Sequence, residues 1–424
     1  MNPTVDELQA ALLTAAARTP GAVCMCLDGA LGGRPGVVLS LSCEPWVSVP
    51  QSASIRALDE VSAALDSLRG PRGVLPAAYG WLSYDALRAP LRGPRTPAAD
   101  PRPFGDQAPS GCLLRAGPSL HLDLDTGALT FPRRREDARS LERALKAALR
   151  RPAARAPLGF RSATDRDGHL ANVRAVREAI RAGEVYLVNV ARALHADAAD
   201  GDAVASRVAL AGAPYAAVLH APGALVGGMS MELALAWDRP AGVARTRPIK
   251  GTRPRHALPA EDARLAEALQ RDPKERAENV MAVDVHRNDL GRVASPGGVT
   301  VPALCAVESH QYVHHLVSTV EARVPLETSA RALLGALLPV GSVTGAPKLA
   351  AMDTIQALER ERRGLYTGVY GCAFGDGSLA LAVAIRTLVL DPGGLHYGVG
   401  GGIVWDSDPL REWDELGWKQ RGVE

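Results

Sequence analysis

A chain of 424 residues with 47% hydrophobic and 22% charged residues is long enough for one large or two ordinary domains and has the composition of a soluble globular protein. The formal net charge of +2 excludes nucleic-acid binding driven by bulk electrostatics, and the 4% aromatic share argues against a base-stacking surface. The six cysteines match neither zinc nor CxxC redox spacing, so we expect reduced thiols.

The sequence also lacks the patterns of secretion and membrane insertion. The first residues contain no basic segment followed by an apolar one, and no run of about 18 uncharged apolar residues occurs. We therefore expect a cytoplasmic protein that binds neither membrane nor nucleic acid.

The N-terminal part of the sequence is the least regular. Residues 1–130 predict short strands and turns around one or two helices, because Pro and Gly interrupt them often. Leu141, Leu145 and Leu149 then recur at helical spacing, and the stretch from Arg150 to Pro157 is rich in Pro, Ala and Arg. We expect a surface helix and a linker here, and we divide the chain into an N-terminal region, 1–155, and a C-terminal region, 156–424.

A helix followed by strands opens the C-terminal region. Thr164 or Asp165 suits a helix N-cap and Gly183 suits the helix end, with apolar residues between them on one face. Strands are predicted at Val185–Leu194 and within Ala216–Met229.

The end of the chain predicts an antiparallel meander. Three β-rich runs, Gly368–Phe374, Ser378–Leu390 and Leu395–Val404, are separated by Gly375-Asp376-Gly377 and Pro392-Gly393-Gly394. No parallel βαβ series and no fixed repeat accompany them.

One lysine is a candidate nucleophile. Lys250 lies in Pro248-Ile249-Lys250-Gly251-Thr252, and four arginines lie within five residues of it: Arg245, Arg247, Arg253 and Arg255. Nearby positive charge disfavours the ammonium form, so a partly buried Lys250 is expected to react as a free amine. The alternative is an ordinary basic surface loop.

Two Glu-x-x-Glu pairs are candidate metal ligands. Glu275 and Glu278 lie in one helical stretch, and Glu412 and Glu415 lie in the last one. Residues three apart share a helix face, so two such helices would present hard oxygen ligands to Mg²⁺. A single pair of this kind is usually solvated surface charge.

Three further features concern anions. The run Gly398–Gly402 allows close backbone approach to a carboxylate, or forms a flexible hairpin. The segment Gly341–Lys348 is predicted to open a helix and to offer amides and hydroxyls at its N-terminus. Arg386 ends an apolar run, where burial requires a carboxylate partner or an anionic substrate. Of His314 and His315 on one strand, one is expected to face inward and one outward.

Set together, these segments resemble the chorismate-utilising enzymes, the family of anthranilate synthase component I, aminodeoxychorismate synthase component I, and the isochorismate and salicylate synthases. The resemblance covers residues 160–420. It rests on Asp272-Pro273-Lys274-Glu275-Arg276-Ala277-Glu278-Asn279, Arg287-Asn288-Asp289-Leu290-Gly291-Arg292, Val307-Glu308-Ser309, His314-His315-Leu316-Val317-Ser318, Gly341-Ser342-Val343-Thr344-Gly345-Ala346-Pro347-Lys348, Ala384-Ile385-Arg386-Thr387 and Ile403-Val404-Trp405-Asp406-Ser407-Asp408-Pro409. It implies an α+β fold with large antiparallel β-sheets flanked by helices.

The resemblance also implies roles for single residues. Lys250 would attack C2 of the chorismate ring, Glu232 would protonate the departing C4 hydroxyl, and His315 would face the ring. Glu278 and Glu415 would bind Mg²⁺, with Glu275 and Glu412 beside or behind them. Substrate contacts are implied for Thr252, Thr344, Tyr366, Arg386, Gly400, Gly401 and Gly402.

Within the family, the residue at position 250 indicates the reaction. Anthranilate synthases typically carry a small residue there, whereas a lysine is similar to the aminodeoxychorismate synthase branch, which makes 4-amino-4-deoxychorismate for 4-aminobenzoate and folate. Anthranilate synthase and a non-catalytic chorismate-binding protein are the alternatives. Leu187 stands where isochorismate and salicylate synthases have a water-activating lysine, which argues against those relatives.

Two partner proteins are implied. Gly371-Cys372-Ala373-Phe374-Gly375 has its cysteine one place early for a Gly-x-Cys-x-Gly nucleophile elbow, so a separate glutamine amidotransferase is expected to supply ammonia. The aminodeoxychorismate lyase that follows is also expected to be a separate protein.

Overall fold

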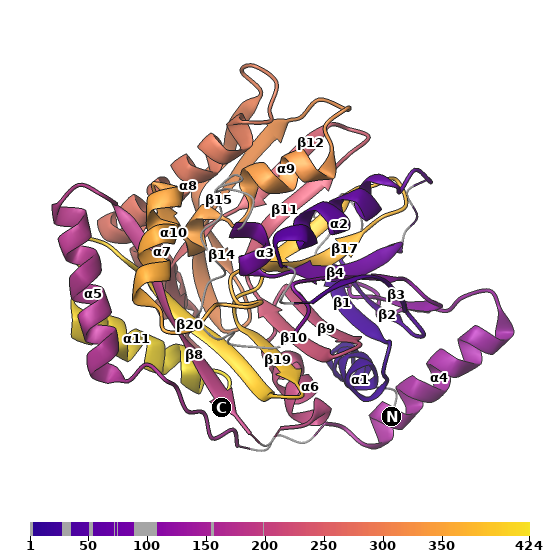
Figure 1. Cartoon of the computed structure of the whole chain (residues 1–424). Coiled ribbons are helices and arrows are strands. Elements are labelled where there is room, and N and C mark those ends of the chain that lie inside the picture. Colours follow the sequence, from indigo (N-terminus) through magenta and orange to yellow (C-terminus); the bar gives the residue numbers. More distant parts are fainter. Residues whose placement is uncertain are drawn as a thin grey trace.

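Two large antiparallel sheets, packed face to face, form the centre of the molecule (Figure 1). The computed structural model describes residues 3–27, 35–50, 54–71, 73, 75–88, 108–153, 157–197 and 199–424. Within these residues, every strand pairing between the named strands is antiparallel. The predicted α+β fold with large antiparallel sheets and flanking helices is confirmed.

The first sheet, sheet A, contains the strands predicted at Val185–Leu194 and within Ala216–Met229. In spatial order its strands are β16 (Gly345–Ala346), β8 (Leu187–Ala196), β20 (Gly394–Ile403), β19 (Thr387–Asp391), β10 (Ala224–Ser230), β9 (Tyr215–Ala221), β1 (Val23–Leu27), β2 (Gly36–Ser40), β6 (Ser119–Asp123) and β7 (Leu129–Thr130).

The second sheet, sheet B, contains the lysine motif at one edge. Its order is β13 (Ile249–Pro254), β15 (Val313–Arg323), β12 (Val243–Arg247), β11 (Leu233–Asp238), β18 (Leu379–Val383), β17 (Val369–Ala373), β4 (Ala78–Leu82), β5 (Gly111–Arg115) and β3 (Glu44–Val49), and β14 (Val299–Ser309) also pairs with β15. Both sheets therefore draw strands from both of the regions that we divided at residue 155.

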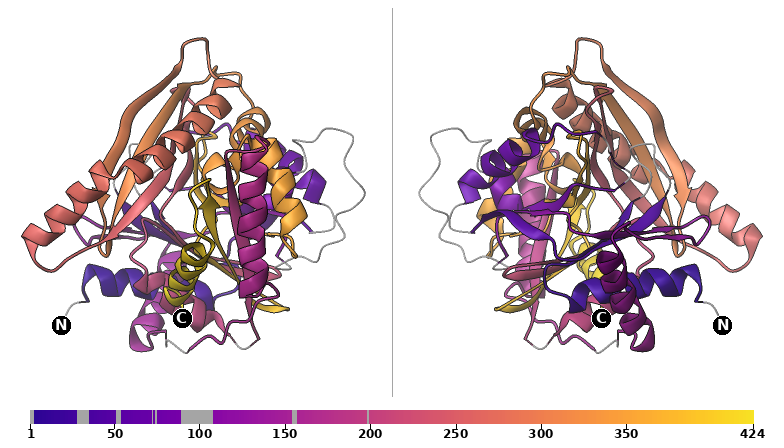
Figure 2. Two further views of the ribbon diagram at one scale, coloured as in Figure 1. Left: turned by 90° about the vertical axis from the view of Figure 1, so that its left-hand side faces the viewer. Right: turned by 90° about the vertical axis from the view of Figure 1, so that its right-hand side faces the viewer.

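Helices cover the outer faces of both sheets. They are α1 (Val5–Arg18), α2 (Ser54–Asp66), α3 (Tyr84–Arg88), α4 (Arg135–Arg150), α5 (Arg166–Arg181), α6 (Gly201–Leu210), α7 (Pro259–Arg271), α8 (Pro273–Gly291), α9 (Ala330–Leu337), α10 (Lys348–Leu358) and α11 (Pro409–Arg421). Helices α1 and α6 pack on sheet A, α2 and α9 pack on sheet B, and α5 lies beside α11 next to β8 and β20 (Figure 1). Figure 2 shows the β14–β15 hairpin and α8 extending to one end of the molecule.

The apolar layer between the sheets explains their packing. Val23 and Val38 from sheet A meet Tyr79, Trp81 and Leu114 from sheet B, all nearly or fully buried. Burial of such side chains contributes about 1.5–3 kcal/mol each. No helix among the described residues is long and apolar enough to cross a membrane.

The helices predicted from capping and periodicity are confirmed. Helix α4 spans the predicted surface helix, and α5 begins after Asp165, whose carboxylate accepts a hydrogen bond from the Gly168 amide at 2.9 Å. Strand β8 begins at Leu187, two residues later than predicted. Part of the predicted linker, 154–156, lies outside the described residues.

The predicted single meander is wrong. The run Ser378–Leu390 divides into β18, in sheet B, and β19, in sheet A, because the chain crosses between the sheets at residues 384–386. Arg386 takes a left-handed φ of 49° at this crossing. The last four strands therefore form two antiparallel pairs in different layers.

A buried ion pair anchors the segment between α10 and β17. Arg363 contacts Glu359 at 2.6 Å, with side chains only 2% and 6% exposed, and also donates to the carbonyls of Val343 and Asn189. We expect Arg363→Met to lower the free energy of unfolding by about 3–5 kcal/mol, because Glu359 stays buried without its partner. Urea unfolding measures this loss. Lys146→Met, which breaks an exposed ion pair with Glu142, should leave the unfolding midpoint unchanged.

Candidate functional site

The predicted nucleophile and the predicted acid meet at one residue. Lys250 Nζ donates to the backbone carbonyl of Ser342 at 3.2 Å, and the Ser342 hydroxyl donates to Glu232 Oε1 at 2.5 Å. Glu232 and Ser342 are buried and Lys250 is half-buried. These three residues come from β13, the loop after β10, and the short 3₁₀ turn η3 (Gly341–Val343). The fold thus joins positions 232, 250 and 342.

The environment of Glu232 suits a proton donor. Burial raises the pKa of Glu232 to about 7, although the hydrogen bond from Ser342 and the positive charge of Lys250 both act to lower it. A carboxyl group with a pKa near 7 holds its proton for part of the time at neutral pH and can transfer it in either direction.

The expectation that the neighbouring arginines surround Lys250 with uncompensated positive charge is wrong. Each of the four arginines has a carboxylate partner: Arg245 contacts Glu321, Arg247 contacts Glu308, Arg253 contacts Asp272 and Glu275, and Arg255 contacts Asp262. Their charges are therefore largely compensated. Lys250 instead lies among acidic groups, since its charge acts on Glu232, Glu278 and Glu415.

A glycine fixes the course of the chain beside Lys250. Gly251 has φ +86°, and a Cβ added there would lie 3.0 Å from Glu275 Oε2. The pairing of β13 with β15 also shifts register between Ile249 and Thr252, on either side of this glycine. Because a side chain at 251 would be strained and crowded, glycine lets β13 run closely past α8.

Two histidines on β15 are both buried, so the prediction that one faces outward is wrong. His315 Nδ1 lies 3.0 Å from Thr252 Oγ1, and burial lowers the pKa of His315 to about 4. His314 lies against α7, with Nε2 3.0 Å from Asp262. Helix α7 covers the side of the strand that carries His314, and the candidate site covers the side that carries His315.

The glycine run lies in β20 and allows close packing around it. A Cβ at Gly400 would lie 2.7 Å from the Tyr366 hydroxyl, and one at Gly401 would lie 3.2 Å from Glu412 Oε2. At Gly402 it would lie 3.2 Å from Leu187 Cδ1 and 3.3 Å from Lys250 Nζ. Regular strand pairing along β20 rules out the flexible-hairpin alternative.

The segment that contains Thr344 does not form the start of the following helix as expected. The Thr344 hydroxyl is fully buried and donates to the Val340 carbonyl at 3.0 Å, while helix α10 begins only at Lys348. The segment from Gly341 therefore precedes the helix rather than forming its first turn.

Arg386 is exposed, so no burial cost arises, and among the described residues no carboxylate forms an ion pair with it. Its charge acts on His315 and Tyr397.

Glu278 of α8 and Glu415 of α11 lie near enough for their charges to act on one another. Burial raises the pKa of Glu278 against the charges of Lys250 and Lys274, and the negative charges of Glu275 and Glu415 raise it further. Burial raises the pKa of Glu412 as well. For Glu415, burial acts to raise the pKa, but Lys419 at 2.7 Å, Lys250 and Lys274 together lower it.

This donor set fits Mg²⁺. Carboxylates that raise one another's pKa gain from a cation between them, and Mg²⁺ commonly takes one or two carboxylates together with substrate and water oxygens. Among the described residues, no group of three or more Asp, Glu, His or Cys side chains is arranged to hold a metal ion by itself. Glu278 and Glu415 are suited to hold the ion jointly with an anionic substrate.

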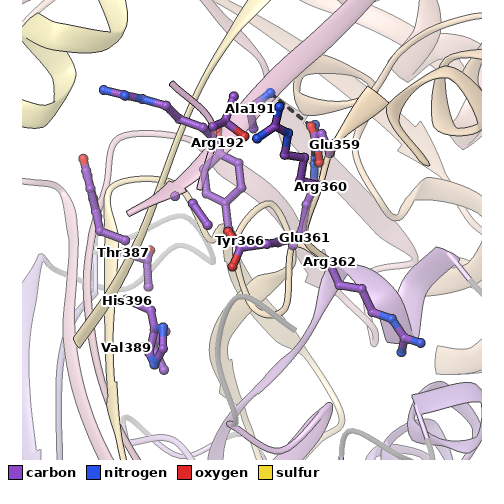
Figure 3. A pocket seen from close by; sticks show the side chains of 15 residues that line it. Ala191, Arg192, Glu359, Arg360, Glu361, Arg362, Tyr366, Thr387, Val389 and His396 are labelled. Atoms are coloured by element: carbon purple, nitrogen blue, oxygen red, sulfur yellow. Dashed lines mark hydrogen bonds and ion pairs between the residues drawn. The ribbon is translucent and has the colours of Figure 1, made fainter. Parts of the chain in front are cut away.

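The described residues also form a pocket (Figure 3). It lies between β8, β19, β20 and the segment 359–366, and of the predicted site residues Tyr366 lines it. Lys250 and Glu232 are not part of its lining. The contacts among Lys250, Ser342 and Glu232 therefore lie outside this pocket.

Two residues that shape the site, Ser342 and Lys419, were not predicted from the sequence. Ser342 lay within a motif noted for its hydroxyls, yet nothing in the sequence indicated that it would join Lys250 to Glu232. Lys419 lies four residues after Glu415, a spacing that predicts an ion pair on a helix. It also donates to the Gly400 carbonyl at 2.7 Å, which ties α11 to β20.

Comparison with known proteins gives the family. Residues 35–423 match the model of the chorismate binding enzymes. The chain is 41% identical to aminodeoxychorismate synthase component 1 of Escherichia coli over 245 residues, 57% of this chain and 53% of that protein. It is 43% identical to an aminodeoxychorismate synthase of Streptomyces griseus over 254 residues, 59% of this chain and 35% of that protein. These alignments span about half of the first relative and about a third of the second.

Two anthranilate synthases align over more of the chain than these two relatives do. Component 1 from Synechocystis is 35% identical over 410 residues, covering 86% of this chain and 80% of that protein. The crystal structure of component I from Streptococcus pneumoniae has a TM-score of 0.76 and 25% identity over 92% of both chains. From the family match and the shared fold, this chain belongs to the chorismate binding enzymes.

Proposed function

We propose that this protein is an aminodeoxychorismate synthase component I, which converts chorismate and ammonia to 4-amino-4-deoxychorismate. The observation that carries the proposal is the joint contact of Lys250 and Glu232 with Ser342. This contact supports the proposal that an amine nucleophile and a carboxyl with a raised pKa act together.

The proposed reaction has two displacements. Lys250 Nζ bonds to C2 of chorismate, the two ring double bonds shift, the C4–O bond breaks, and Glu232 protonates the departing hydroxyl to give water. Ammonia then bonds to C4, the double bonds shift back, the C2–N bond to Lys250 breaks, and the new C4 ammonium group returns one proton to the Glu232 carboxylate. His315 lies against the ring, and Arg386, Tyr366 and the Gly400 amide hold the enolpyruvyl carboxylate. Thr252 and Thr344 contact the substrate beside Gly401 and Gly402.

Glu278 and Glu415 would hold Mg²⁺, with Glu275 and Glu412 in support. When bound, the ion neutralises the ring carboxylate and fixes its position. We expect Glu278→Gln to raise the Mg²⁺ concentration that gives half-maximal activity by about tenfold or more, because one anionic ligand is lost. Asp284→Asn, on the exposed side of the same helix, should leave that concentration unchanged. Titration of initial rates with Mg²⁺ measures both, and equal requirements in the two variants would contradict the assignment.

Two separate partners follow from the proposal. The relative from E. coli is named as component 1, which supports a glutamine amidotransferase subunit that supplies ammonia. A separate aminodeoxychorismate lyase would complete 4-aminobenzoate for folate. We expect the amidotransferase to act with this chain, and the lyase to act on its product, in the cytoplasm.

Anthranilate synthase is the second candidate, favoured by the longer alignment with the Synechocystis enzyme. Incubation of the purified chain with chorismate, Mg²⁺ and ammonium, followed by mass spectrometry, separates the two. We expect 4-amino-4-deoxychorismate, which an added lyase converts to 4-aminobenzoate. Anthranilate as the main product would overturn the proposal.

A further inference from the structure

Ser342 occupies a position to which neither the family resemblance nor the proposed mechanism gives a role. Ser342 is 4% exposed, and its side chain and its backbone contact different residues. Its hydroxyl reaches Glu232 and its carbonyl accepts from Lys250. One residue therefore contacts both groups on which the proposed chemistry depends.

The turn that carries Ser342 is held firmly on three sides. A Cβ added at Gly341 would lie 2.3 Å from Val285 Cγ1, so the turn packs directly on α8. The Val343 carbonyl accepts from the buried Arg363 guanidinium at 2.9 Å, and the Thr344 carbonyl accepts from the Asn189 amide at 2.8 Å. Because the backbone on both sides of Ser342 is fixed, its hydroxyl and carbonyl are fixed in direction.

We propose that Ser342 is a positioning residue that sets the placement of the acid Glu232 relative to the nucleophile Lys250. This inference rests on the proposed function. A positioned donor keeps the carboxyl group in the orientation that a departing hydroxyl needs, and small misplacements of such groups cost about 100-fold in rate.

The same contact affects the protonation of Glu232. The groups that act on this carboxyl are the Lys250 charge and the Ile249 amide from β13, and the Ser342 hydroxyl from η3. A donated hydrogen bond favours the ionised form. Its loss should therefore move the pKa of Glu232 upward and keep the acid protonated to higher pH.

Ser342→Ala tests the inference, because it removes the hydroxyl and keeps the carbonyl that contacts Lys250. The pH profile of kcat/KM is measured as chorismate consumption, with unprotonated ammonia held constant at each pH. Ser342→Cys, which keeps the volume but donates weakly, is the second variant and carries the test if the alanine variant folds poorly. Ser206→Ala is the matched control, since it removes a buried hydroxyl that bonds only within α6.

We expect Ser342→Ala to lower kcat/KM by about 100-fold and to move the alkaline limb of the profile to higher pH. Ser342→Cys should show a smaller shift in the same direction, and Ser206→Ala should match the wild type. A rate loss with an unmoved limb, or an unchanged rate, would overturn the inference. Product identity is read separately, so anthranilate from the wild type would refute the proposed function while the shift of the limb still tests Ser342.

Discussion

Lys250→Ala is expected to lower kcat for the amination of chorismate by about 10³-fold or more, because alanine removes the atom that bonds to C2. The remaining site would still bind chorismate, since the proposed carboxylate contacts lie on other residues. Single-turnover kinetics with chorismate, Mg²⁺ and ammonium measures the loss.

The control for this variant is Lys146→Ala on the exposed face of α4, which should keep wild-type kcat. Lys250→Arg keeps the positive charge beside Glu232 but supplies a poor nucleophile, so it should be as inactive as the alanine variant. Recovery of activity in Lys250→Arg would mean that position 250 acts by charge alone.

Glu232→Gln is expected to lower kcat by about 10²–10⁴-fold, the usual contribution of a general acid. Since the pKa of Glu232 is about 7, the acid is protonated below this pH and ionised above it. The kcat/KM of the wild type should therefore fall as the pH rises above about 7.

In Glu232→Gln this alkaline limb should disappear, because glutamine does not titrate. A profile that keeps the limb would assign it to another group. Glu267→Gln, in an exposed ion pair on α7, should leave the profile of the wild type intact.

The sequence predicted the elements whose signals are local. An N-cap carboxylate and apolar residues at helical spacing identified α5, because capping and burial of one face act within a few turns. The pairing of Glu275 with Glu278 and of Glu412 with Glu415 also follows from helical spacing. That the charges of Glu278 and Glu415 act on one another does not, since it depends on contacts between distant parts of the chain.

Three errors share one cause, namely that burial and partners depend on the other layers. The run Ser378–Leu390 looked continuous because its apolar residues continue through the crossing between sheets. One of His314 and His315 was expected to face outward, but α7 covers His314 and both are buried. The arginines around Lys250 looked uncompensated, whereas each finds a carboxylate from another element.

The measurement that tests the central claim most directly is trapping of the adduct on Lys250. The wild type is mixed with chorismate and Mg²⁺ without ammonium, quenched, digested and analysed by peptide mass spectrometry. We expect the peptide that contains Lys250 to gain the mass of chorismate less one water, and Lys250→Ala to show no such gain. Consumption of chorismate on later addition of ammonium, with this peptide never modified, would contradict the account.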